Sequence, residues 1–145
     1  MKPALQFRLL RIALLFSAFV WGVSAVGVFL KWETAATTLQ GLGAQPINYD
    51  PMLDYWLRMA AGAFALVGTG YLLLAMFPRK YAVMLPWFGW IMIMEGAILL
   101  THGLRLGLAP MPFLGDVSAS FAGGLGILML RNSVREHEQH DGTIR

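Results

Sequence analysis

Four ionisable residues interrupt an otherwise apolar stretch between Pro86 and Asp116, namely Glu95, His102, Arg105 and Asp116 itself. A charged group in a segment suited to hydrocarbon is costly, so each of them needs a partner, a polar cavity or a chemical task. Glu95 and His102 are seven residues apart, which places them on one face of a helix, and Arg105 continues that face. Any chemistry of this chain is therefore expected around this stretch.

Residues from the neighbouring segments could converge on the same face. Arg58 lies at a comparable depth in the preceding apolar segment, and Asp116 shares a helical stripe with Ser120 in the following one. Three interpretations stay open. The groups could form interhelical ion pairs, such as Glu95 with Arg58 and Arg105 with Asp116. They could instead line a ligand pocket, or a buried Glu95 could relay protons.

Other kinds of chemistry have less support in the sequence. Imidazole is a common axial ligand, so His102 could ligate haem or chlorophyll, but no second histidine lies on another apolar segment. The tail carries His137 and His140 among acidic residues, which we interpret as a solvated charged tail rather than a metal site. There is no cysteine and no motif of a nucleophilic or metal-dependent enzyme. We expect no cofactor, no metal and no catalytic residue. An enzyme that acts on a membrane substrate stays open as an alternative, with Glu95, His102 and Asp116 as its candidate residues.

The composition identifies the elements that must position these groups. Hydrophobic residues make up 57% of the 145 residues and charged residues only 13%, whereas globular proteins have about 25% charged residues. The charges cluster and leave four long apolar windows, each long enough to cross a bilayer as a helix. The sequence predicts one all-α transmembrane domain over residues 1–145, an antiparallel four-helix bundle with spans at about 9–30, 54–77, 81–105 and 112–131.

The distribution of Lys and Arg predicts the orientation. Eight of the 11 basic residues lie on one side of the predicted spans: in the N-terminus, in the turn between spans two and three, and in or just before the tail 132–145. The other three lie on the opposite side, which also has the outer loop 31–50. By the positive-inside rule both termini are expected in the cytoplasm of a bacterium, and the protein in its inner membrane. The basic residues form no face for nucleic acid. Val23-Ser24-Ala25 resembles a signal-peptide cleavage site, but the apolar run continues to Leu30, so we expect an uncleaved helix.

Local signals mark the helix ends. Asp50 followed by Pro51 predicts an N-cap and first turn for the second span, and Pro78 should end that span. With only three residues between them, the second and third spans are expected to form a hairpin in direct contact. Pro86 either kinks the third span or begins it, and the sequence does not separate the two alternatives. The fourth span should begin near Pro112.

The second span also carries a resemblance to a known type of protein. Its start reads Tyr55-Trp56-Leu57-Arg58-Met59, and glycines follow at 62, 68 and 70. In this the chain resembles small four-helix bacterial membrane proteins of the DoxX-like type, which place an arginine at the head of a glycine-bearing span. Many such proteins have no assigned activity, so the resemblance implies a fold but no catalytic residue.

Small residues four apart indicate close helix packing, either inside the chain or against a partner. Such pairs are Ala18 with Gly22, Ala61 with Ala65, Ala119 with Gly123, and Ser120 with Gly124. The first functional hypothesis is an accessory or structural subunit without catalysis of its own, which contacts the bilayer and other membrane subunits or a second copy. The alternative is binding or transport of a small amphiphile, such as a lipid or a quinone-like molecule, at the outer polar cluster around Glu95.

Overall fold

The computed structural model describes residues 3–108 and 110–134, and within these ranges the chain is helical without strands. Four helical segments are long and apolar enough to cross a membrane. They are Ala4–Phe29, Pro51–Met76, Ala82–Leu106 and Phe113–Leu130. The prediction of an all-helical chain with four helices able to span a membrane is confirmed at this level.

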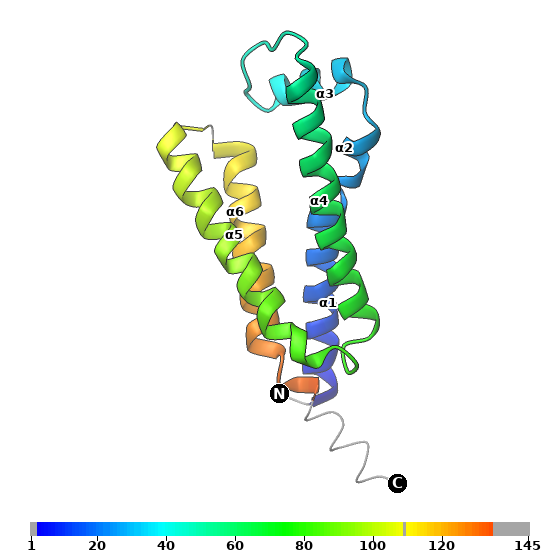
Figure 1. The fold of residues 1–145 in the computed structure, drawn as a ribbon. Coiled ribbons are helices and arrows are strands. Elements are labelled where there is room, and N and C mark those ends of the chain that lie inside the picture. Colours follow the sequence, from blue (N-terminus) through cyan, green and yellow to red (C-terminus); the bar gives the residue numbers. More distant parts are fainter. Residues whose placement is uncertain (1–2, 109, 135–145) are drawn as a thin grey trace.

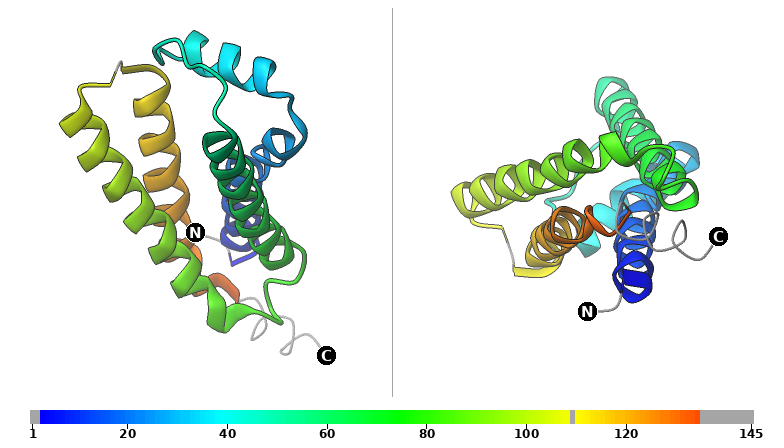
Figure 2. Two further views of the ribbon diagram at one scale, coloured as in Figure 1. Left: turned by 45° about the horizontal axis from the view of Figure 1, so that its top comes forward. Right: turned by 90° about the horizontal axis from the view of Figure 1, so that it is seen from below.

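The long helices are arranged as two pairs (Figure 1). In one pair α1 (Pro3–Gly22) packs along α4 (Pro51–Met76), and in the other α5 (Leu85–Leu106) packs along α6 (Pro110–Leu130). Contacts between α1 and α6 join the pairs, so that α6 lies between α5 and α1 (Figure 2). The start of α1 and the end of α6 lie at the same end of the molecule as the turn between α4 and α5 (Figure 1).

The expected close hairpin of the second and third spans is wrong over most of its length. Helices α4 and α5 touch near their shared turn, where the Tyr71 hydroxyl donates to the Phe88 carbonyl at 2.7 Å and the two rings meet edge to face. From there the two helices diverge (Figure 1). A short connection requires only that the joined ends be close, and the packing partners of α4 and α5 are α1 and α6 instead.

The predicted start and end of the second span agree with the structure. Asp50 caps α4 by accepting from the backbone N–H groups of Met52 and Leu53 at 2.8 and 3.1 Å, and α4 ends at Met76, before Pro78. The open question of Pro86 is resolved, because it lies in the first turn of α5. A short 3₁₀ turn, Ala82–Met84, precedes it. Glu95 consequently lies midway along the 22 residues of α5.

Helix α6 starts slightly earlier than expected, at Pro110, but Met111 has non-helical φ and ψ of −108° and 132°. The stretch long and apolar enough to span a membrane begins at Phe113, close to the predicted start at Pro112. Before it, α5 ends at Gly107, whose φ of 63° is left-handed and therefore suits glycine. These residues make the break between α5 and α6.

Two features of the N-terminal third were not predicted. The first span is interrupted at Val23 and Ser24, after which the short helix α2 (Ala25–Phe29) continues and packs against α4. The segment expected to be an outer loop contains helix α3 (Trp32–Gly41). The sequence of α3 is only 10 residues long, is rich in threonine, which is a modest helix former, and has few strongly apolar residues, so it gives little signal of a helix. Trp32 is buried and meets Tyr49 edge to face at 5.5 Å between ring centroids.

Candidate functional site

A cavity of about 210 Å³ lies where the two helix pairs face each other, and residues of α1, α4, α5 and α6 line it. We call it the deep cavity. Its polar lining residues are Trp21, Ser24, Glu95, Asp116 and Ser120, and its apolar lining residues are Val20, Phe64 and Leu99. Of the six residues of the predicted polar cluster, Glu95, Asp116 and Ser120 line this cavity.

A second cavity, of about 680 Å³, adjoins the first, because Leu99 and Asp116 line both. We call it the mouth cavity. The end of α3 and the segment after it, residues 42–45, line one side, and the last two turns of α5 with His102 line another. Together these two neighbouring cavities, which share Leu99 and Asp116 as walls, are called the cleft; their lining extends from the end of α3 to Glu95 at the middle of α5.

The two acids in the cleft have no cationic neighbour among the described residues. Within residues 3–108 and 110–134, no Lys, Arg or His group lies within 4.0 Å of the carboxylate of Glu95 or Asp116. No basic residue lines the deep cavity either. The deep cavity thus combines a half-buried acid, Glu95, and an exposed acid, Asp116, with largely apolar walls. Inside a membrane such charges are costly unless a proton or another group neutralises them.

Ser120 differs from the other buried serines. Ser17 and Ser133 each donate a hydrogen bond to a carbonyl of their own helix or turn, Ala13 at 2.9 Å and Leu130 at 2.7 Å. The residue Ser120 is only 3% exposed, and its hydroxyl makes no hydrogen bond to any other described residue. Since Ser120 lines the deep cavity, its hydroxyl is available to a bound molecule.

Two residues of the cleft wall, Trp21 and Ser24, were not among the site residues predicted from the sequence. Trp21 meets Phe64 edge to face at 5.3 Å between ring centroids, and its indole Nε1 is buried without a hydrogen-bond partner. Ser24 donates to the Trp21 carbonyl at 2.6 Å and to the Ala61 carbonyl at 3.1 Å, which ties the break after α1 to α4. The available signal was a polar residue, Ser24, three positions after Trp21 in an apolar span, which was weighed only as part of a possible cleavage site.

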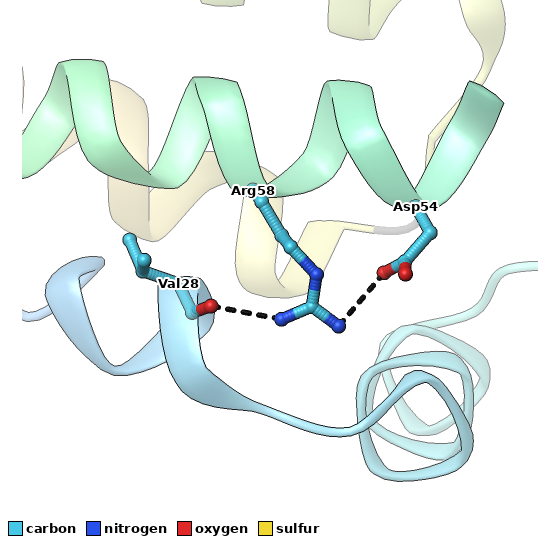
Figure 3. Close-up of polar contacts among 3 residues, drawn as sticks. All are labelled: Val28, Asp54 and Arg58. Atoms are coloured by element: carbon cyan, nitrogen blue, oxygen red, sulfur yellow. Dashed lines mark hydrogen bonds and ion pairs between the residues drawn. The ribbon is translucent and has the colours of Figure 1, made fainter. Parts of the chain in front are cut away.

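The predicted ion pair between Arg58 and Glu95 is wrong. The guanidinium of Arg58 binds Asp54, one turn earlier on α4, with 3.0 Å between Nη2 and Oδ1. It also donates from Nη1 to the Val28 carbonyl at 2.8 Å (Figure 3). Arg58 therefore links α4 to the end of α2 and lines neither cavity. An acid one turn away on the same helix is reached without any tertiary contact, which explains the error.

The second predicted pair, Arg105 with Asp116, is also wrong, because no such pair exists among the residues that the structure describes. Arg105 is exposed and lines neither cavity, whereas Asp116 lines both. The third residue of that helix face, His102, lines the mouth cavity.

Ligation of haem or chlorophyll by His102 stays a prediction. Among the described residues, no group of three or more His, Asp or Glu side chains could hold a metal ion. The tail histidines His137 and His140 lie outside the described residues.

Comparisons of the chain with protein-family models, curated proteins and solved structures find no match. The class that fold and site define is a helical membrane protein with four candidate spans and a polar cleft between two helix pairs. The resemblance to DoxX-like proteins stays a prediction. The functional argument consequently rests on the chemistry of the cleft.

Proposed function

We propose that the protein binds a small amphiphile in the cleft, with the polar group of the ligand in the deep cavity and its apolar part toward the mouth cavity. The observation that carries the proposal is that Glu95, Asp116 and Ser120, on two helices, line one cavity whose other walls are largely apolar. Ligand sites in helical bundles combine a few convergent polar groups with an apolar surround in this way. The proposal includes no catalytic step.

The size and lining of the cleft support this function. Ligand pockets commonly have volumes of about 300–1,000 Å³. The deep cavity has about 210 Å³ and the adjoining mouth cavity about 680 Å³, so the cleft can hold a headgroup and the first part of a chain or ring system. The walls contributed by Val20, Phe64 and Leu99 suit such an apolar part. A lipid or a quinone-like molecule has this combination of a polar and an apolar end.

The proposed setting is the bacterial inner membrane, in which the four long helices form an antiparallel bundle with both termini in the cytoplasm. The support is the concentration of Lys and Arg at the two termini and at the turn between α4 and α5, on the cytoplasmic side by the positive-inside rule. The mouth cavity and α3 then face the outer side. A ligand would enter the cleft from outside or from the outer leaflet.

The accessory-subunit hypothesis has less support than ligand binding. That hypothesis was based on small residues spaced four apart, and several of these lie at contacts between helices of the chain itself. A Cβ on Gly68 would lie 2.7 Å from the Gly22 Cα, and a Cβ on Gly124 would lie 2.8 Å from the Gly89 carbonyl oxygen. Close approaches of α1 to α4 and of α5 to α6 therefore explain these glycines without a partner protein.

Mass spectrometry of the native protein, released from membranes in a mild detergent, tests the proposal. We expect a small amphiphile to accompany the wild-type chain and to be lost in Ser120→Leu, because the larger side chain would fill part of the deep cavity. Ser118→Leu is the matched control, since Ser118 is exposed, lies on the same helix and lines neither cavity. Retention of the same amphiphile by both variants would contradict the proposal.

The Ser120→Leu variant could lose the ligand simply by misfolding. Leu99→Trp provides a second obstruction from α5, and Leu99 lines both cavities. Thermal unfolding of each variant in the same detergent identifies those that keep the wild-type fold. A folded cleft variant that still carries the amphiphile at the wild-type ratio would refute the assignment of the cleft as its site.

A further inference from the structure

The charge of the cleft specifies the kind of ligand more closely than its shape does. We propose that the deep cavity takes a cationic headgroup, and that the ligand is an amphiphilic organic cation such as an amine or a quaternary ammonium. This inference rests on the proposed function, because it names the chemical class of the molecule bound in the same cleft. It is carried by the two acids, the free hydroxyl and the aromatic wall of the cavity taken together.

The first step concerns countercharge. Both arginines that the sequence placed near Glu95 lie elsewhere: Arg58 is bound to Asp54 and to the Val28 carbonyl, and Arg105 lines neither cavity. His102 lines the mouth cavity, but it does not lie within 4.0 Å of either carboxylate. The deep cavity consequently presents carboxyl groups from α5 and α6 and no cation from the described chain. A cationic ligand would complete the pairing that acids inside a membrane protein require.

The second step concerns the remaining polar group. Ser120 is buried, lines the cavity, and differs from Ser17 and Ser133 in donating to no carbonyl of the described chain. A serine whose hydroxyl is unpaired at a cavity wall has a hydrogen bond to give or to accept, and an ammonium N–H would supply the donor. A quaternary ammonium would instead contact the oxygen lone pairs electrostatically.

The third step concerns the aromatic residues. Trp21 and Phe64 line the deep cavity from α1 and α4, opposite the helices that carry the acids. Aromatic rings attract organic cations through their negative faces, and indole is the strongest of them in this respect. An acidic wall facing an aromatic wall discriminates a cation from a neutral or anionic amphiphile of the same size.

The test compares two ligands of nearly identical shape, benzyltrimethylammonium and its uncharged carbon analogue neopentylbenzene. Binding to the full chain is measured by calorimetry in an uncharged maltoside detergent, with empty micelles as the blank. We expect the cation to bind at least about tenfold more tightly than the neutral analogue. Glu95→Gln with Asp116→Asn should lower the affinity for the cation by at least about tenfold and leave that for the neutral analogue unchanged.

Asp54→Asn is the matched control, because it removes a carboxylate that lies outside the cleft, and it should leave the affinity for the cation unchanged. If the wild type binds both ligands equally well and the two amide substitutions change neither affinity, the ligand is not a cation, although the cleft would still be an amphiphile site. Binding of neither ligand, together with no amphiphile in the natively purified protein, would overturn the proposed function as well.

Discussion

The close contact between α1 and α4 makes a quantitative prediction for Gly68→Ala. A methyl group at this position would lie 2.5 Å from the Gly22 nitrogen, 2.7 Å from its Cα and 3.1 Å from the Ala18 carbonyl oxygen. These are backbone atoms, so no side-chain rotation can relieve the overlap, and the two helices must separate. Overpacking of this kind costs about 1–3 kcal/mol, and replacing a helical glycine by alanine returns up to about 1 kcal/mol.

Gly62→Ala provides the control on the same helix. Its added methyl group would lie 3.9 Å from the Val28 Cγ2, which is ordinary van der Waals contact. The gain in helix propensity is the same in both variants, so it cancels in the comparison. We therefore expect Gly68→Ala to be less stable than Gly62→Ala by about 1–3 kcal/mol. The measurement is unfolding in maltoside micelles with increasing dodecyl sulfate, and equal unfolding free energies would refute the close approach of α1 to α4.

Three further predictions concern single polar contacts, each read out as the change in unfolding free energy. Tyr71→Phe should cost about 1 kcal/mol, because it removes the buried hydroxyl that donates to the Phe88 carbonyl; an unchanged value would contradict that bond. Asp50→Ala should cost about 1 kcal/mol through loss of the N-cap of α4, whereas Asp50→Asn should be nearly neutral, so equal losses in both would argue against capping. Arg58→Ala should cost more than Asp54→Asn, since only the first removes the hydrogen bond to the Val28 carbonyl as well as the ion pair; the reverse order would contradict Figure 3.

Local signals in the sequence were sufficient to predict the four apolar spans and several helix ends. The Asp50-Pro51 start and the stop before Pro78 depend on groups within one helical turn of each other, so no distant contact can change them. The helical stripe of Asp116, Ser120, Gly123 and Ile127 was likewise predictable from periodicity. In the structure its first two residues line the cavity, and Ile127 is fully buried in the core.

Contacts between helices were harder to predict, because several partners compete for each side chain. Arg58 has an acid one turn away at Asp54, which local spacing favours, and another on α5 at Glu95, which only the packing of the helices could bring within reach. The choice depends on which helices pack together. Since α4 packs on α1 and α2 and diverges from α5, the guanidinium reaches Asp54 and the Val28 carbonyl.

The sequence by itself determined that this is a helical membrane protein and that Glu95 lies in the middle of an apolar span, because hydrophobicity and helix-end chemistry act over a few residues. Only the tertiary structure decided what Glu95 faces. Contacts within each helix pair hold its two helices side by side, and α4 diverges from α5 (Figure 1). Between the pairs lies the cavity lined by Trp21, Asp116 and Ser120. Such a cavity depends on the directions of whole helices, which no local pattern of residues encodes.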